Sequence, residues 1–432
     1  MNTSQDEYPR VLQELYSLQK HGIKFGLSRT ENLLSRIGNP HLGRSFLHIG
    51  GSNGKGSVGC LLEESLRASG YRTGLFTSPH LVSFRERFRI NGSPIPPGEV
   101  VSLYRELEEA MERREPPTFF EAVTAMALSC FAANHTDIAV VEVGMGGRLD
   151  ATNLITPLVS VITNISLEHR EFLGDSLLEV AQEKAGIIKP DAPLVTGATQ
   201  SQVLEVFSRA CREAKTPMYH LDRDFPFSQR EKELSFSGPN LELEEVCVGL
   251  SGDHQRRNAA LALAALDLLK GRGWALEPEG IRRGFSEAVW PGRLHRVQSD
   301  PPVILDGAHN PAAAQELASA VRGEWTDTPL ILLLGIMEDK DAADMLRPLL
   351  PLASRVVFTR PEYPRSMDPQ TLCDNSPVPL PPHEVIPSLP EALERGLQAA
   401  IDQNGLLLIC GSLFTVGEAL SWIDPASFPP EM

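Results

Sequence analysis

Residues 50–57 read GGSNGKGS, a glycine-rich run that ends in a lysine, a glycine and a serine. The general phosphate-loop pattern has a Ser or Thr directly after the lysine, whereas here Gly56 separates Lys55 from Ser57. Glycines let backbone N–H groups turn inward toward an anion, and the lysine adds a full positive charge. The stretch therefore predicts a phosphate-binding loop. The hydroxyl available to magnesium is that of Ser57, which follows the lysine by two positions instead of one.

The residues on either side of this loop predict a strand before it and a helix after it. SFLHI (45–49) is a short apolar run, and VGCLLEESLRASG (58–70) has apolar residues at helical spacing with a glycine at its end. A strand–loop–helix order is the context in which a phosphate loop binds nucleotide, since the positive end of the helix faces the anion. The loop residues predicted to bind ATP are Gly51, Ser52, Asn53, Gly54, Lys55, Gly56 and Ser57.

Further apolar runs alternate with helical patterns along the first two thirds of the chain. IAVVEV (138–143) and LVSVITNI (158–165) are typical of buried strands, and residues 254–270 have helical spacing. Such alternation predicts a mainly parallel sheet covered by helices. Residues 221–250 are shorter and more polar, which predicts a small antiparallel patch.

A change in composition at WPGRLHRVQSDPP (290–302) marks a predicted linker. Beyond it a second series of apolar runs predicts a smaller α/β domain, at 303–306, 330–337, 355–360 and 406–410. The predicted domains are residues 1–292 and 293–432. Residues 361–390 contain nine prolines and are expected to be irregular.

The composition restricts the partners. The chain has 432 residues, with 40 Lys+Arg against 56 Asp+Glu and a formal net charge of −16. This balance argues against a broad nucleic-acid or anionic-membrane surface. The start has no basic and apolar leader pattern, and the apolar runs are too short to span a bilayer. The six cysteines are scattered without a C-x-x-C pair, so we expect mostly buried free thiols in a reducing cytoplasm. We also expect a monomer.

Glu142 is the strongest candidate for a metal ligand outside the loop. It stands inside an apolar run, where a carboxylate is costly unless it is paired or binds a cation. An acid near the carboxyl end of a strand is where an α/β protein places a metal ligand beside a phosphate loop. Two interpretations remain open, a magnesium ligand or a salt bridge to a neighbouring arginine.

GMGGRLDATN (144–153) follows Glu142 directly. It is not the dinucleotide fingerprint, because Leu149 breaks G-x-G-x-x-G. Its glycines predict a close backbone approach, and Arg148 and Asp150 predict polar contacts to a ligand.

A set of motifs runs in order along nearly the whole chain. They are KFGLSRTENLL, HIGGSNGKGSV, TSPHLVSFRERFRING, TFFEAVTAMAL, VEVGMGGRLDATN, EHREFLGDSLLEVAQEKAGIIKP, GDHQRRNAALAL, PGRLHRV, LDGAHNP and ICGSLF. With these motifs the chain resembles the folylpolyglutamate synthase/dihydrofolate synthase family of the Mur ligase superfamily. The resemblance implies a P-loop Mur-ligase-like ATPase domain with a mainly parallel sheet, plus a smaller Rossmann-like α/β C-terminal domain. In this family a glycine follows the lysine, which accounts for Gly56.

The resemblance also implies roles for residues that spacing alone does not single out. Ser57 and Glu142 match magnesium ligands, and His169 matches a residue at a second magnesium. Lys184, in QEKAGIIKP, matches a lysine that is carbamylated in the family. Lys55, His169 and Lys184 are therefore the implied catalytic residues. Without the resemblance, His169 is best interpreted as a structural histidine and Lys184 as a solvated helix charge.

The remaining implied contacts concern ATP and the substrates. For ATP they are Asn258, Arg293, Asp306 and His309. For the pterin-bearing substrate they are Thr118, Phe120, Asp150 and Ala151, and for glutamate Ser412. The chain departs from the family pattern at Gly50 and Ser52, at Glu168 and Arg170 beside His169, and at Arg85.

The implied activity is ATP-dependent addition of L-glutamate to dihydropteroate, to tetrahydrofolate polyglutamates, or to both, through an acyl phosphate. We favour the bifunctional enzyme. The alternatives are a monofunctional folylpolyglutamate synthase and another Mur-superfamily amide ligase, such as a cell-wall or cyanophycin-type enzyme. A nucleotide-dependent switch is a further class, but the chain lacks the N-K-x-D signature of guanine recognition.

Overall fold

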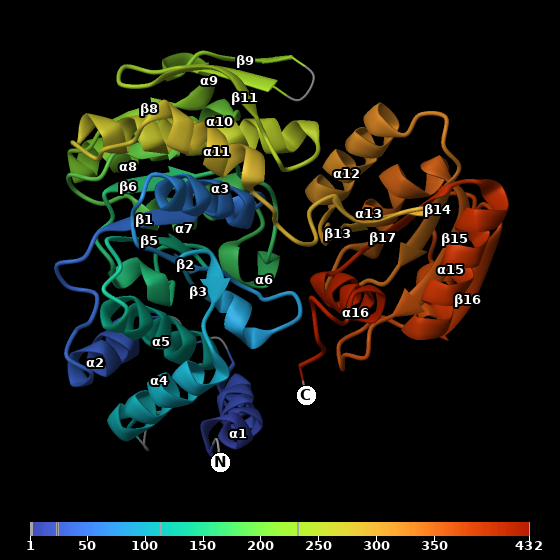
Figure 1. Ribbon diagram of the computed structural model, residues 1–432, viewed down its shortest axis with the longest axis horizontal. Helices are drawn as coiled ribbons and strands as arrows, with labels where there is room; N and C mark the ends of the chain where they lie inside the picture. The colour runs from blue at the N-terminus through green and yellow to red at the C-terminus, as the bar shows by residue number, and fades with distance from the viewer. Residues whose placement is uncertain (1–2, 23, 25, 113–114, 231–232, 432) are drawn as a thin grey trace. The chain divides into compact units, whose positions relative to one another are not determined.

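The computed structural model describes residues 3–22, 24, 26–112, 115–230 and 233–431. The chain forms two compact units. Unit 1 comprises Met1–His80, Arg85–Gly249 and Gln255–Ala288, and unit 2 comprises Leu81–Phe84, Leu250–His254 and Val289–Met432. Figure 1 draws β13 to β17 and α12 to α16, which build most of unit 2, in orange and red.

Unit 1 contains an eight-stranded sheet in the order β4-β3-β2-β5-β1-β6-β7-β8. In this order all neighbouring strands from β2 to β8 are parallel, whereas β3, near one edge, pairs antiparallel with both β2 and β4. The predicted, mainly parallel sheet is therefore confirmed. The strands are β1 (Phe46–Gly50), β2 (Thr73–Phe76), β3 (Phe88–Ile90), β4 (Ser93–Pro94), β5 (Ile138–Glu142), β6 (Val159–Ile162), β7 (Leu194–Thr196) and β8 (Met218–His220).

Helices cover both faces of this sheet, and Figure 1 shows α3 and α5 on opposite sides of its strands. Gly59 of α3 lies against Leu75 and Val140, so this helix packs directly on β2 and β5. Gly74 leaves room for the ring of Phe131 from α5, which would lie 2.5 Å from an added Cβ. The helices are α1 (Thr3–Ser17), α2 (Ser28–Arg36), α3 (Lys55–Ala68), α4 (Pro97–Ala110), α5 (Phe119–Ala133), α6 (Arg170–Leu173), α7 (Leu177–Lys184), α8 (Ser201–Ala214), α9 (Leu221–Asp224), α10 (Asp253–Gly271) and α11 (Pro278–Glu287).

A small second sheet lies within residues 221–250. Its strands β9 (Phe227–Arg230), β10 (Glu233–Ser237) and β11 (Glu242–Cys247) pair antiparallel in the order β11-β10-β9. Leu234 and Phe236 alternate with more exposed neighbours, which is the period-2 pattern of a strand with one buried face. The predicted antiparallel patch is confirmed.

Unit 2 contains a six-stranded sheet in the order β12-β13-β17-β14-β15-β16. It is parallel except for β12, which pairs antiparallel with β13. Its strands are β12 (His295–Ser299), β13 (Pro302–Asp306), β14 (Leu330–Leu334), β15 (Ala353–Arg360), β16 (His383–Ser388) and β17 (Leu406–Cys410). Its helices are α12 (Pro311–Glu324), α13 (Ala342–Leu349), α14 (Pro369–Asp374), α15 (Leu389–Gln403) and α16 (Leu413–Ile423).

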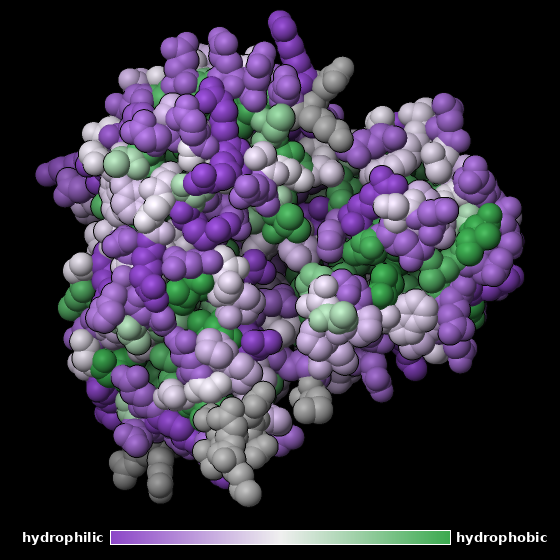
Figure 2. All heavy atoms as spheres, in the orientation of Figure 1, coloured by the Kyte–Doolittle hydropathy of each residue, from purple (hydrophilic) through white to green (hydrophobic). Residues whose placement is uncertain are grey.

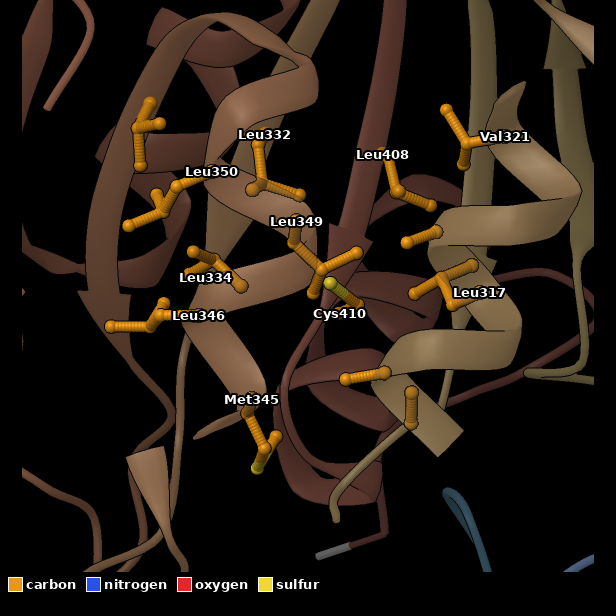
Figure 3. Packing of buried hydrophobic residues seen from close by; sticks show 14 of the residues in the cluster. Leu317, Val321, Leu332, Leu334, Met345, Leu346, Leu349, Leu350, Leu408 and Cys410 are labelled. Atoms are coloured by element: carbon orange, nitrogen blue, oxygen red, sulfur yellow. The ribbon is translucent and has the colours of Figure 1, made fainter. Parts of the chain in front are cut away.

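Burial on both faces explains the continuous apolar runs in unit 2. Leu332 and Leu334 of β14 pack with Leu317 and Leu346 from α12 and α13, as Figure 3 shows. The intervening residues Ile331 and Leu333 belong to a separate core with α15 and α16. Fully burying each such branched side chain contributes about 1.5–3 kcal/mol. Parallel strands covered on both faces therefore need apolar residues at every position.

The expectation that residues 361–390 are irregular is wrong in part, because α14 and β16 lie there. Pro369 occupies the first turn of α14, where its missing N–H has no helical partner to lose. Pro387 lies in β16, which is the edge strand of its sheet. An edge strand tolerates proline because one side of its backbone is not paired.

All six cysteines are free thiols. Five of them are buried and Cys247, at the end of β11, is exposed, so the prediction of mostly buried free thiols is confirmed. Burial raises the pKa of the Cys211 thiol to about 12.

In the part of the chain that the structure describes, no helix is both long and apolar enough to cross a bilayer. The face seen in Figure 2 is mostly hydrophilic, with hydrophobic residues in small separate areas.

Candidate active site

The glycine-rich loop connects the end of β1 to the start of α3. Gly51 has φ +132° and Gly54 has φ +84°, conformations that L side chains rarely adopt. An added Cβ on Gly51 would lie 1.9 Å from Oγ1 of Thr163, and one on Gly54 would lie 2.5 Å from Oδ1 of Asn258. Both glycines are thus required by backbone conformation and by space. Asn258, an expected ATP contact, lies directly against the loop.

Residues that follow β6 hold the loop in place. Asn164 accepts from the backbone N–H of Ser52 at 3.0 Å through its carbonyl, and from that of Asn53 at 2.9 Å through its side chain. Thr163 Oγ1 donates to the carbonyl of Asn53 at 2.6 Å. Sequence reasoning missed this segment, although TNIS follows an apolar strand directly. Because β6 and β1 are parallel neighbours, their carboxyl ends meet at one edge of the sheet.

Two lysines converge on one carbonyl of the loop. The Nζ of Lys55 donates to the oxygen of Gly51 at 3.0 Å and to that of Ser52 at 3.3 Å. The Nζ of Lys184 donates to the same Gly51 oxygen at 3.0 Å and lies 2.6 Å from Oε1 of Glu168. The center of the loop therefore carries concentrated positive charge, partly balanced by one buried carboxylate.

Burial and neighbouring charges shift the pKa values of both Lys184 and Glu168. Burial alone would raise the pKa of Glu168, but Lys184 and then Lys55 lower it to about 2. Burial lowers the pKa of Lys184, an effect that outweighs the opposing attraction of Glu168. Glu168 is thus held as a carboxylate, and removing a proton from Lys184 is easier than from an exposed lysine.

The chemistry of the donors fits a magnesium ion at Ser57 and Glu142. The Oγ of Ser57 is buried and has no hydrogen-bond partner among the described residues. Glu142 ends β5, level with Ile49 of β1, and its Oε2 accepts from the backbone N–H of Ser78 at 3.1 Å. Hydroxyl and carboxylate oxygens are the ligands that magnesium prefers.

His169, expected at a second magnesium, precedes α6 in the left-handed conformation, with φ 44° and ψ 46°. Such a backbone is uncommon for a residue other than glycine and occurs frequently at functional sites. Within the described ranges no group of three or more His, Cys, Asp or Glu side chains could hold a metal. The second magnesium therefore stays a prediction.

Phe120 and Thr118 stand at the start of α5. Gly144 comes two residues after Glu142, and an added Cβ there would lie 2.3 Å from Cζ of Phe120. The ring therefore lies directly on the backbone that follows β5. Thr118 is the N-cap of α5 and forms a capping box with Glu121, which also pairs with Arg29 at 3.2 Å. These contacts fix the two candidate substrate residues relative to β5.

Asp150 is buried in the loop of residues 144–153, which follows β5. Its Oδ2 accepts from the N–H of Met145 at 2.9 Å, and its Oδ1 accepts from the N–H of Thr152 at 3.0 Å and from the Thr152 hydroxyl. That hydroxyl lies 2.9 Å from Nε2 of His48 in β1. Burial raises the pKa of the Asp150 carboxyl, although these hydrogen bonds oppose the shift. Ala151 follows at the start of a short 3-10 helix, Ala151–Leu154.

Arg148 is turned toward α7. Its backbone N–H donates to the carbonyl of Glu183 at 2.8 Å, and its Nη2 donates to that of Gln182 at 3.1 Å. The guanidinium thus joins the loop to the carboxyl end of that helix, which cations favour.

The other expected contacts lie in unit 2, with Arg293 in the turn before β12 and the rest at the carboxyl ends of β13 and β17. Asp306 pairs in register with Cys410 of the neighbouring strand. His309 bonds through Nδ1 to the carbonyl of Gly307 at 2.8 Å. Ser412 is the N-cap of α16, where its Oγ accepts from the N–H of Thr415 at 3.0 Å. The structure thus brings Asp306, His309 and Ser412 to one edge of one sheet.

The departures from the family pattern have different surroundings. Glu168 belongs to the buried ion pair, whereas Arg170 pairs with exposed Asp175 at 2.9 Å. Arg85 donates to the carbonyl of Ile95 at 3.4 Å.

A strand, a glycine-rich loop with its lysine and the N-terminus of a helix define a nucleotide-binding α/β protein, and two family models make the class specific. The Mur ligase middle domain matches residues 49–266, and the Mur ligase, glutamate ligase domain matches residues 292–413. The protein is thus a ligase of the Mur type. The chain belongs, within this class, to the dihydrofolate synthase/folylpolyglutamate synthase family.

Individual relatives support this assignment. The dihydrofolate synthase/folylpolyglutamate synthase of Bacillus subtilis is 34% identical over 92% of this chain and 95% of its own. The Mycobacterium tuberculosis folylpolyglutamate synthase complexed with ADP has a TM-score of 0.89 at 33% identity, covering 96% of this chain and 99% of its own. The Escherichia coli FolC complex with DHPP and ADP has a TM-score of 0.88 at 30% identity, covering 96% and 98%.

Proposed function

We propose that this chain is bifunctional and joins L-glutamate both to dihydropteroate and to tetrahydrofolate polyglutamates, with ATP as the energy source. One observation carries the proposal. Glu142, the proposed magnesium ligand at the end of β5, comes two residues before Gly144, on which the ring of Phe120 lies. Buried Asp150 accepts hydrogen bonds in the same turn. The proposed magnesium ligand and the proposed substrate residues therefore lie at one strand end within unit 1.

The chemistry begins with activation of a carboxylate, which is a poor electrophile. Its oxygen attacks the γ-phosphorus of ATP, and the bond to the bridging oxygen breaks, which gives an acyl phosphate and ADP. The glutamate amine then attacks the acyl carbon, loses a proton and displaces phosphate. Bringing two unit charges to 4 Å costs about 4 kcal/mol at an effective dielectric of 20. Lys55 and the N–H groups at the start of α3 are proposed to offset this repulsion, since phosphoryl transfer depends mainly on positioning and electrostatics.

Ser57 and Glu142 are the residues that would hold magnesium, and the ion would supply positive charge to the phosphate oxygens. The unpartnered hydroxyl of Ser57 supports this assignment. His169 is proposed for a second ion. Asn258, Arg293, Asp306 and His309 are proposed for ATP, and Ser412 for glutamate.

Lys184 is proposed to become carbamylated in the working enzyme. The neutral amine would bond to the carbon of carbon dioxide and release a proton. Burial lowers the pKa of this lysine and so favours the reactive neutral form. Formation of the carbamate would break the ion pair with Glu168. Lys184 therefore cannot be carbamylated and paired with Glu168 at the same time.

The runner-up is a monofunctional folylpolyglutamate synthase. One assay run with two substrates separates the proposals. Glutamate-dependent ADP release is measured with dihydropteroate and with tetrahydrofolate, each with ATP and magnesium. Turnover of both supports the bifunctional enzyme, turnover of tetrahydrofolate alone supports the runner-up, and turnover of neither rejects both.

A further inference from the structure

Leu294 has a strained backbone in the turn that leads into β12. Its φ is 42°, in the left-handed region, and its side chain is buried in the core of unit 2. A bulky L residue avoids this region because its Cβ crowds the following carbonyl oxygen, an equilibrium penalty of about 5- to 30-fold. Such a conformation persists only where surrounding contacts impose it.

The carboxylate of Asp306 supplies these contacts. Its Oδ2 accepts from the backbone N–H of Leu294 at 2.9 Å, and its Oδ1 accepts from that of Ala308 at 2.9 Å. The N–H of Gly307 also donates to the carbonyl of Gly292 at 2.8 Å. The turn is therefore joined to the end of β13 on both sides of Arg293.

Arg293 lies between these two attachments. An added Cβ on Gly307 would lie 2.7 Å from Nη1 of Arg293 and 2.4 Å from Cδ2 of Leu413. The guanidinium thus lies directly on the glycine backbone at the carboxyl end of β13. The position of this guanidinium depends on the conformation of the turn, because Arg293 is the residue directly before Leu294.

We propose that Asp306 is a positioning residue, which holds Leu294 in the left-handed conformation and thereby sets the guanidinium of Arg293 for the nucleotide. The inference rests on the proposed function, in which Arg293 contacts ATP. It adds a role exerted through Arg293 to the contact with ATP that is proposed above for Asp306 itself. Each carboxylate oxygen accepts one backbone N–H group and keeps a second acceptor site.

The test measures ADP binding to the full chain by titration calorimetry, without folate or glutamate. Asp306→Ala is combined with Leu294→Gly or with Leu294→Ala. Both substitutions at 294 remove the buried side chain, but only glycine adopts positive φ freely. We expect D306A to weaken binding by at least about tenfold, the size of one lost charge-assisted contact. The L294G/D306A double variant should bind at least about fivefold more tightly than L294A/D306A.

Two controls make the test decisive. With Asp306 present, L294G and L294A should bind ADP within about threefold of each other, since the carboxylate then imposes the turn. In an Arg293→Ala background, D306A should weaken binding at least about threefold less than it does with Arg293 present, because residues that act as one unit are not additive. Equal binding by the two double variants, or an undiminished effect of D306A without Arg293, would overturn the proposal and leave Asp306 with direct contact alone.

Thermal unfolding of every variant checks that it folds. Asp306→Asn retains one acceptor oxygen and replaces D306A if that variant is unstable. Failure of the proposed function is seen separately, as wild-type protein that binds ADP but releases none with either folate substrate.

Discussion

Lys184 and Glu168 form a buried ion pair, with 2.6 Å between Nζ and Oε1 and side chains that are 3% and 10% exposed. The same Nζ donates to the carbonyl of Gly51. The pair thus attaches the phosphate loop to the end of α7.

Removing the lysine from this pair should destabilise unit 1. In buffer free of metal and carbon dioxide, Lys184→Met leaves Glu168 buried without its ion-pair partner, so the free energy of unfolding should fall by about 3–5 kcal/mol. Urea titration measures this loss. The double variant Lys184→Met/Glu168→Gln is the matched control and should recover most of it. A single variant as stable as the wild type would contradict the importance of the pair.

With bicarbonate, magnesium and nucleotide present, the same lysine should carry carbon dioxide. Native mass spectrometry should then find one added carbon dioxide in wild-type protein and none in Lys184→Ala. A short carboxylic acid should restore part of the turnover of that variant, because it replaces the carbamate oxygens. An unmodified mass under these conditions would remove the carbamate from the mechanism.

Lys55→Ala should reduce glutamate-dependent ADP release by at least about 100-fold, the size expected for one main transition-state charge. Lys270→Ala is a suitable control, since its Nζ donates to the carbonyl of Leu276 away from the loop. Near-normal turnover in K55A would refute the role of this lysine.

Ser57→Ala should raise the magnesium concentration for half-maximal rate by at least about tenfold, because one oxygen ligand is lost. Its stability should change little, as the hydroxyl has no hydrogen-bond partner among the described residues. Ser65→Ala, in the same helix, removes a hydroxyl that donates to Leu61 at 2.7 Å and should leave the magnesium dependence unaltered. Identical magnesium curves for S57A and wild type would exclude Ser57 as a ligand.

Acid should destabilise the protein through His48. Burial, followed by the nearby charge of Lys189, lowers the pKa of this histidine from 6.5 to about 3. The unfolded chain then binds a proton that the folded chain excludes, so stability is present above the unfolded pKa. It is lost as the pH falls toward the folded value, by about 1.4 kcal/mol per pH unit. Urea unfolding between about pH 7 and pH 5 should show a shallower loss for His48→Asn. Equal slopes would show that His48 does not titrate in this way.

Local patterns predicted the elements well where burial alone decides them. LILLL and FLHIG are buried at every position, and a strand covered on both faces has no other pattern. The contact between Thr163 and Asn53 joins residues 110 positions apart, which no local pattern contains. No local pattern indicates either that Glu168 pairs with Lys184, at the end of α7. The elements missed within residues 361–390 contain prolines at the helix start and on an edge strand, where proline is permitted.

The distribution of thiols has a practical consequence. Since Cys247 is the exposed member of the six, a maleimide dye should mark the native chain at one place, at the end of β11. One engineered surface cysteine in unit 2 would then provide a second fluorophore. Energy transfer between the two dyes would report in solution whether the units approach when nucleotide binds.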